Sequence, residues 1–534
     1  MRPQRLRVAS VLAVLTVIAT ACGNGGSSAP SETGSAIPTA GATIIHGTTD
    51  SIVSLDPAGQ YDLGSYQISA QVYDTLLEVP PQGNTAEPSL AESCEYSDPV
   101  TYTCTLRSGI TFSDGSDLTS EDVVYSLQRN IEIDDPNGAC SLLIDLAACG
   151  KWNAKSVETP DPQTVIFHLA QPDNTFPFIL TTSAAFVVPS DVYAVDEEQD
   201  GAKIVGSGRY TVAQYRYPEQ IVLEANPTYW GDAPLNAQVI VQYFAKSSAL
   251  KLALEQGEVD VGYRTFTPTD VAAMRNESGL QVLTGPGAEI RYMAFNTSLE
   301  PGQDHAVRQA VAMTVDRQAI ADNVYNGTVQ PLWSMVPSNL VGHVDAFKDL
   351  YGDAPDVDGA TQTLADAGVK TPVPIEIWWT PTHYGDFSAD EYTEVKRSLD
   401  GSGLFDVTLK STEWEAYSEA ATTDAYPVYQ LGWFPDYPDA DNYVFTFYAS
   451  TSYLNDHYSN PKVEKLLADE RATTDADRRM KDIEEIQKIG AQDVPLIPIW
   501  EGTQLGVARE GVTGVEQTLD VAYLLRYWLI SKTA

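Results

Sequence analysis

An aromatic and acidic segment near the C-terminus has the residue types that recognise a cation. Residues 431–443 read LGWFPDYPDADNY and carry the carboxylates Asp436, Asp439 and Asp441 among aromatic side chains and two prolines. Prolines stiffen a loop, aromatic faces attract cations, and a carboxylate between them can pair with one. The segment predicts either a cation-binding loop or a proline-rich turn whose rings lie in the core.

Sequence signatures of enzymes are missing from the chain. There is no HExxH motif, no GxSxG elbow, no Walker A loop and no GxGxxG after a strand, and Gly206-Ser207-Gly208 is short enough to be a turn. The six histidines lack the spacing of metal ligands. A Ser-His-Asp triad stays open, because its members converge only in space. We expect a protein that is not an enzyme, with no catalytic residue, cofactor or metal.

The N-terminus has the pattern of a secretory signal, predicted at residues 1–21. Three arginines precede an apolar run at 8–21, which is shorter than the roughly 20 residues that span a bilayer. The run ends in Ala19-Thr20-Ala21 before Cys22, a junction that resembles the lipobox of bacterial lipoproteins, with Ala19 where leucine is usual. Residues 22–42 are rich in Gly and Ser and would form a flexible tether. Secretion without lipidation is the alternative.

The other four cysteines predict two disulfides, which export permits. Four cysteines allow three pairings, and local spacing favours Cys94 with Cys104 and Cys140 with Cys149. The residues between the first pair suggest a hairpin. Metal binding is the weaker interpretation, because the separations do not match common zinc spacings and no histidine lies within the cluster.

Composition indicates a large, folded and very acidic protein. The 534 residues include 32 Lys+Arg and 73 Asp+Glu, a formal charge of −41, with 43% hydrophobic residues, 28 Tyr and 9 Trp. Such a charge excludes nucleic acid as a partner and repels an anionic bilayer. Loss of the signal with its three arginines takes the charge to −44. Membrane attachment would therefore be covalent, through Cys22.

Strands and helices alternate along the chain, which predicts a mixed α/β fold. Helices are expected to begin at Thr119, where Asp122 completes a capping box, and at Ser247, Asp304 and Asn460. The expected strands are residues 42–47, 164–169, 220–223, 239–244, 291–295, 375–379 and 497–500.

Several segments resemble, in the same order, the family of solute-binding proteins that serve oligopeptide and dipeptide ABC importers, known as extracellular solute-binding protein family 5. Residues 431–443 resemble its GWxxDYxDxxN segment, and residues 101–127 its signature block. The segments 87–93, 226–230, 294–297, 307–310 and 316–317 also match, whereas Gly206-Ser207-Gly208-Arg209-Tyr210 departs from the usual GTGPY.

The resemblance implies the large two-lobed periplasmic-binding-protein fold (type II, cluster C), with an extra subdomain in lobe I. Lobe I would take residues 43–78, 206–290 and 505–534, and the inserted subdomain residues 79–205. Lobe II would take residues 291–504. A ligand would lie between the lobes, and the lobes would close on it by a hinge motion.

The resemblance also implies a function and a binding site. In peptide-binding members the Asp of the GWxxD segment pairs with the ligand's α-ammonium, and that position matches Asp436. Trp433 would give an aromatic wall, as would Tyr437, and Thr48, Thr49 and Asp50 are candidate contacts from lobe I. The expected protein is a monomeric lipoprotein, anchored outside the cytoplasm through Cys22, that delivers oligopeptides or dipeptides to the permease subunits of an ABC transporter.

Two alternatives remain at this point. The same fold also serves oligosaccharides, nickel complexes and haem, although the chain has no convincing His or Cys cluster for nickel. A glycan hydrolase would need two carboxylates at a catalytic separation. A structure with only one carboxylate facing the cleft would favour a receptor over that hydrolase.

Overall fold

The computed structural model describes residues 41–381, 383–385 and 387–532. These described residues form one compact unit. The signal peptide predicted at 1–21, Cys22 and nearly all of the tether lie outside the described residues. Among the described helices, none has the length and apolar character needed to cross a membrane.

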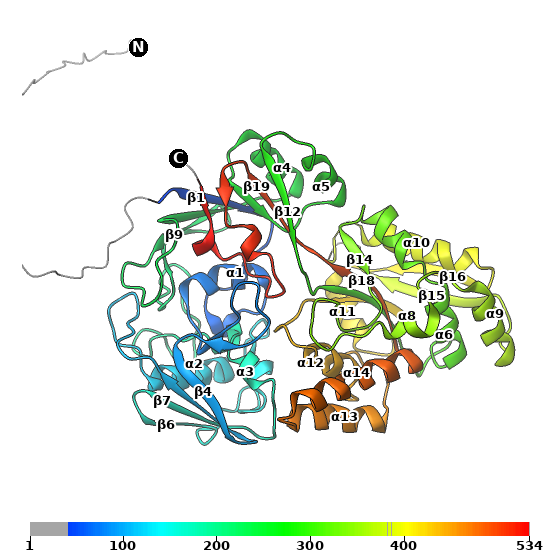
Figure 1. Ribbon diagram of the computed structural model, residues 1–534, viewed down its shortest axis with the longest axis horizontal. Coiled ribbons are helices and arrows are strands. Elements are labelled where there is room, and N and C mark those ends of the chain that lie inside the picture. The colour runs from blue at the N-terminus through cyan, green and yellow to red at the C-terminus, as the bar shows by residue number, and fades with distance from the viewer. Residues whose placement is uncertain (1–40, 382, 386, 533–534) are drawn as a thin grey trace, which may run out of the picture. The chain divides into compact units, whose positions relative to one another are not determined.

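The first large sheet has seven strands in the order β12-β19-β11-β1-β10-β9-β8 (Figure 1). β1 lies parallel to β10 and β11, and the remaining pairs are antiparallel. Ile44, Val239, Val261 and Ala508 are wholly buried in the core of this sheet. Its strands are β1 (Thr43–Thr48), β8 (Tyr210–Arg216), β9 (Gln220–Ala225), β10 (Gln238–Tyr243), β11 (Val261–Tyr263), β12 (Leu280–Gly285) and β19 (Gln504–Arg509).

The second large sheet has six strands in the order β14-β18-β13-β17-β15-β16. Every residue of its central strand β13 is buried, as expected for a strand covered on both faces. The strands are β13 (Ile290–Phe295), β14 (Val329–Pro331), β15 (Val373–Trp379), β16 (Phe405–Ser411), β17 (Val428–Trp433) and β18 (Leu496–Gly502). Helices found with this sheet are α6 (His305–Thr314), α8 (Ala346–Tyr351), α9 (Val357–Asp366), α10 (Ser388–Gly401), α11 (Trp414–Ala421), α12 (Asp441–Tyr448), α13 (Pro461–Ala472) and α14 (Ala476–Asp493).

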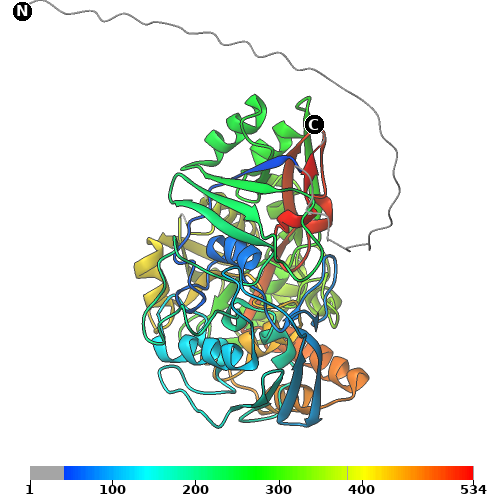
Figure 2. The same ribbon diagram turned by 90° about the vertical axis from the view of Figure 1, so that its left-hand side faces the viewer.

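A third sheet of four strands lies in the predicted inserted subdomain, in the order β4-β5-β7-β6. Figure 2 shows this sheet at the opposite end of the view from the green helices α4 (Ser247–Gln256) and α5 (Pro268–Met274). Cys94 and Cys104 are paired across β4 and β5 and form a disulfide, so the stapled hairpin is confirmed. The elements are β4 (Ala91–Asp98), β5 (Thr101–Leu106), β6 (Val157–Asp161), β7 (Thr164–His168), α2 (Ser120–Ile133) and α3 (Phe176–Ile179).

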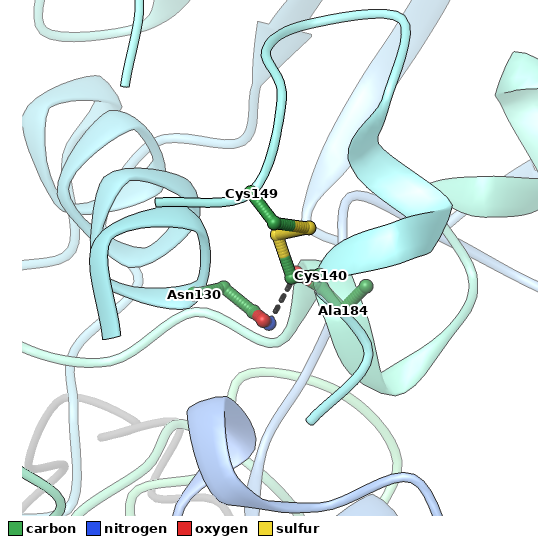
Figure 3. The surroundings of a disulfide bond; sticks show 4 residues. All are labelled: Asn130, Cys140, Cys149 and Ala184. Carbon is green, nitrogen blue, oxygen red and sulfur yellow. Dashed lines mark hydrogen bonds between the residues drawn. A yellow bond between two sulfur atoms is a disulfide. The ribbon is translucent and has the colours of Figure 1, made fainter. Parts of the chain in front are cut away.

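The second predicted disulfide, Cys140–Cys149, is also confirmed (Figure 3). It lies beside the C-terminal part of α2, where the Asn130 side chain donates a hydrogen bond of 3.1 Å to the carbonyl of Ala184. Asp134 is close enough to both sulfur atoms to form a metal-sized cluster. Because the sulfurs are bonded to each other, they are not thiolate ligands, and the disulfide interpretation is preferred.

Local sequence signals account for the helix ends. Thr119 and Asp122 form the predicted capping box of α2, and Asp304 and Asn460 cap α6 and α13 with their side chains. Gly257 ends α4 in the left-handed region at φ 78°, which glycine adopts without strain. The remaining elements are α1 (Leu63–Val72), α4 (Ser247–Gln256), α5 (Pro268–Met274), α7 (Arg317–Ala319), β2 (Leu77–Glu78), β3 (Glu87–Pro88), β20 (Val512–Thr513) and β21 (Ser531–Lys532).

Two crossing segments join the large sheets, one between β12 and β13 and one between β18 and β19. Gly502 donates a backbone hydrogen bond to Glu289, and the Tyr523 hydroxyl accepts one from the backbone of Ala288 and another from Glu289. A side chain at Gly287 would meet the carbonyl of Gly502 at 2.3 Å, so the segments pack at a distance that only glycine permits. The lobe ranges expected from the sequence stay a proposal.

Candidate functional site

A cavity of about 1070 Å³ is lined by side chains from both large sheets and their loops. Asp50 follows β1, Arg264 follows β11, and Arg291 lies in β13. The loop after β17 contributes Trp433 and Asp436. The cavity is large enough for a small organic ligand, since such pockets measure roughly 300–1,000 Å³.

Asn442 fixes the shape of the loop that carries Asp436. Its side-chain carbonyl accepts hydrogen bonds of 3.0 Å from the indole of Trp433 and from the backbone of Asp436. Its amide donates a hydrogen bond of 2.7 Å to Oδ2 of Asp436. The carboxylate is therefore held in place by an amide on the first turn of α12.

Asp436 lines the cavity, and the described residues give it no ion-pair partner. Its Oδ1 accepts a hydrogen bond from the hydroxyl of Tyr61, in the loop before α1. Burial raises the pKa of Asp436, and the hydrogen bonds from Tyr61 and Asn442 only partly oppose this rise. A ligand ammonium would supply the positive charge that the protein does not.

The other two carboxylates of the segment are used by the protein itself. Asp439 accepts hydrogen bonds of 2.9 and 2.7 Å from Arg479, and Asp441 accepts bonds of 2.9 and 2.7 Å from Arg471. Neither Asp439 nor Asp441 lines the cavity. Of the three carboxylates, only Asp436 lines the cavity. The expectation of a single carboxylate at the cleft is not met, because the lining also includes Asp50, Asp62, Asp74, Glu78 and Glu289.

The two predicted aromatic walls differ in position. Trp433 lines the cavity and stacks on Tyr453, with ring centroids 5.8 Å apart. Tyr437 reaches the lining but is only 6% exposed, because it packs with the core of the third sheet and stacks on Phe178 at 5.8 Å. Trp433 therefore offers a face to a ligand, and Tyr437 mainly joins the loop to the third sheet.

The three candidates after β1 are also placed differently. Thr49 and Asp50 line the cavity, and Asp50 pairs with Arg264 at 3.3 Å. Thr48 lies outside the lining, and its hydroxyl accepts a hydrogen bond from the backbone of Asp50. Thr48 therefore supports the backbone at Asp50 and does not line the cavity.

Sequence reasoning missed three residues of the cavity: Tyr61, Arg264 and Arg291. The guanidinium of Arg264 lies 5.2 Å from the ring of Phe434 and that of Arg291 4.2 Å from the ring of Tyr384. Arg264 and Thr265 both have left-handed backbones, at φ 48° and 58°. None of the three belongs to a motif, so no sequence signal could have found them.

Comparisons with known proteins agree with this architecture. The model of a family described as "Bacterial extracellular solute-binding proteins, family 5 Middle" matches residues 85–455. The "Periplasmic murein peptide-binding protein MppA" of Escherichia coli is 24% identical over 91% of this chain and 93% of that protein. The "Heme-binding protein A" of Haemophilus influenzae is 26% identical over 93% of this chain and 94% of its own length.

A solved structure shows the same fold. The periplasmic binding protein DppA of Helicobacter pylori, in complex with the peptide STSA, has a TM-score of 0.76 at 22% identity and covers 92% of this chain and 98% of its own. The expected two-lobed α/β fold is therefore confirmed.

Proposed function

Because the chain belongs to family 5 of the bacterial extracellular solute-binding proteins, we propose that it captures peptides in the cavity around Asp436 and delivers them to the permease of an ABC importer. The family is one of transport proteins that bind substrates rather than convert them. The observation that carries the proposal is a half-buried carboxylate, Asp436, that lines the cavity without a cationic partner among the described residues.

The physical basis is the pairing of Asp436 with a peptide's α-ammonium. A hydrogen bond to a charged group contributes about 1.5–3 kcal/mol, and exclusion of water strengthens the charge interaction. Trp433 would contact the ligand with its ring, and Thr49 and Asp50 would approach from the side of β1. Two peptide-binding proteins among the matches support this choice of ligand.

Affinity selection from a randomised tripeptide library, read by mass spectrometry, tests the proposal. The parent protein should enrich free peptides over the same library with acetylated N-termini. Asp436→Asn should weaken binding of free peptides roughly 10- to 150-fold, the equivalent of the energy above. Acetylated peptides, which lack the ammonium, serve as the matched control and should change little. Equal enrichment of free peptides by parent and variant would reject the anchor role.

Attachment and delivery complete the proposal. Cys22 would carry a lipid that holds the protein at the outer face of the membrane, because a surface of formal charge −44 would be repelled by anionic lipid. Mass spectrometry of the mature N-terminus should find the lipid on Cys22. Delivery is tested by uptake of a labelled, enriched peptide in host cells with and without this protein. Uptake that is equal in both strains would count against delivery.

Haem is the second candidate ligand, favoured by the likeness to "Heme-binding protein A". His383 lines the cavity and stacks on Trp414 at 3.5 Å, so an imidazole is present there. Titration with hemin, followed by its absorption spectrum, separates the candidates. Saturable binding of one equivalent that persists in Asp436→Asn would favour haem over peptides.

A further inference from the structure

A carboxylate lies buried behind the cavity wall, at a helix position where an apolar side chain is expected. The inward face of α10 repeats every four residues through Glu391, Val395 and Leu399, and all three are wholly buried. Such a stripe is ordinarily apolar, because a buried charge costs free energy unless it is paired. A residue that breaks a local pattern in this way is expected where function requires it.

Glu391 holds two side chains of the cavity wall by their polar atoms. Its Oε2 accepts a hydrogen bond of 2.5 Å from the hydroxyl of Tyr325 and one of 2.9 Å from the indole N–H of Trp500. Its Oε1 accepts a hydrogen bond of 3.3 Å from the side-chain amide of Gln430. Tyr325 and Trp500 line the cavity, whereas Glu391 and Gln430 do not. The carboxylate therefore acts on the cavity through the two rings.

The rings of Tyr325 and Trp500 form one unit of the wall. Their centroids lie 4.9 Å apart, although Trp500 comes from β18 and Tyr325 from the segment between α7 and β14. A tyrosine hydroxyl has one hydrogen to donate, and so has an indole. Because Glu391 accepts both, neither ring has a donor left for a ligand, and the rings offer it mainly carbon atoms.

The buried position of Glu391 is held at a cost. Burial raises the pKa of Glu391, and the hydrogen bonds from Tyr325 and Trp500 oppose this rise. The charge of Arg291 also acts on Glu391, but Arg291 forms its ion pair with Glu289, at 2.7 Å. Well-packed apolar residues often serve stability as well as buried charges do. A carboxylate retained here, on two donors of the cavity wall, indicates a role in the shape and chemistry of that wall.

We infer that Glu391 is a positioning residue that determines specificity: it holds Trp500 and Tyr325 as a subsite for an apolar or aromatic side chain of the ligand. The inference rests on the proposed function, since the ligand is taken to be a peptide. A polar side chain that left water for ring carbons would lose its hydrogen bonds, whereas an apolar side chain would lose none. The subsite therefore disfavours Ser, Asn and Gln at the peptide position that it contacts.

Selection from a randomised tripeptide library, read at each peptide position by mass spectrometry, tests the preference. The parent should enrich Phe, Leu and Met over Ser, Asn and Gln at one position by about tenfold, the discrimination that a matched apolar pocket typically gives. Enrichment of peptides without such a preference at any position would overturn the inference and leave the proposed function intact. No enrichment of any peptide would overturn both.

Variants of Glu391 connect the preference to its carboxylate. Glu391→Leu completes the apolar stripe but leaves the donors of Trp500 and Tyr325 without an acceptor, so Ser, Asn and Gln should be enriched as strongly as Phe and Leu. Glu391→Gln keeps an amide oxygen for both donors and can pair with the amide of Gln430, so it should restore the preference. If Glu391→Leu does not fold, Glu391→Asp, whose side chain is too short to reach both donors, replaces it with the same expectation. A parental preference in these variants that lack the acceptor would overturn the role of Glu391.

Gln487→Leu is the matched control for the loss of a buried polar side chain. Gln487 is wholly buried in α14, accepts a hydrogen bond of 2.7 Å from the hydroxyl of Ser334 and does not line the cavity. The variant should lose thermal stability and keep the parental preference. A loss of preference equal to that of Glu391→Leu would show an effect of general destabilisation and overturn the inference.

Discussion

Asp436 and Asp441 lie five residues apart in one segment, and the protein treats them in opposite ways. Asp441 is wholly buried and accepts hydrogen bonds from two nitrogens of Arg471. Burial alone would raise the pKa of Asp441, but the guanidinium of Arg471 is the main group that lowers this pKa to about 2. The carboxylate of Asp436 accepts hydrogen bonds from the hydroxyl of Tyr61 and the amide of Asn442, and its backbone N–H donates to the side-chain carbonyl of Asn442. Burial raises the pKa of Asp436.

Among similar carboxylates, the presence or absence of a protein cation distinguishes a structural residue from a candidate binding residue. A carboxylate neutralised by a protein arginine contributes to stability and has no capacity left for a ligand. A carboxylate that is partly removed from water and has no cationic partner is held at a cost, and a cationic ligand relieves that cost.

The largest effect is expected for Arg471→Gln. Removal of the guanidinium leaves the buried charge of Asp441 uncompensated, which typically costs about 3–5 kcal/mol. Urea denaturation of the ligand-free protein measures the change. Arg478→Gln is the matched control, because Arg478 is exposed and pairs with Asp469 at the surface, where such pairs contribute about 0–1 kcal/mol. A loss of stability for Arg471→Gln as small as that of the control would show that Arg471 does not neutralise a buried charge on Asp441.

A smaller effect is expected from acid. The pKa of Asp441 is lowered in the folded protein, so its contribution is present above the ordinary pKa near 4 and disappears as the pH falls toward 2. The loss should be about 2 kcal/mol between pH 4 and pH 2. Urea denaturation of the parent and of Asp441→Asn between pH 4 and pH 2 measures this loss. An equal change of the free energy of unfolding with pH in both proteins would contradict the lowered pKa of Asp441. The pKa of Asp436 is raised in the folded protein, so the contribution of Asp436 to stability should increase as the pH falls.

Tyr61→Phe should destabilise the ligand-free protein by about 1.5 kcal/mol, the value of one hydrogen bond to a charged group. The change keeps the ring and removes only the hydroxyl that reaches Asp436. A double-mutant cycle with Asp436→Asn isolates the pair, since Tyr61→Phe should cost much less when the carboxylate is absent. Equal costs in both backgrounds would show that the two side chains are not coupled.

The smallest effect on stability is expected for Asp436→Asn itself. Without ligand, the variant should lie within about 0.5 kcal/mol of the parent at pH 7. Its amide oxygen can accept from Asn442 and its amide N–H can donate to the hydroxyl of Tyr61, while the cost of a partly desolvated charge is removed. Asp441→Asn is the contrasting variant and should be clearly less stable than its parent. If Asp436→Asn were the less stable of the two, Asp436 would be a structural residue.

Much of the fold could be predicted because its signals are local. The capping box at Thr119, the proline after Asn460 and the alternation in residues 164–169 give α2, α13 and β7 near their observed positions. Both disulfides close short loops, so spacing was enough to pair them. The ranges of the lobes stay a prediction, since each lobe draws on segments distant in sequence.

The sequence by itself determined the family, the mixed α/β class, the disulfide pairing and the choice of residues 431–443 as the candidate segment. The resemblance singled out Asp436, but residue patterns could not show how the three carboxylates are paired, because their partners Tyr61, Arg479 and Arg471 lie up to 375 residues away. Which of these carboxylates lines the cavity, and that Arg264 and Arg291 line it too, follows from the tertiary structure. The physical reason is that burial and charge pairing depend on neighbours in space, which local residue patterns do not specify.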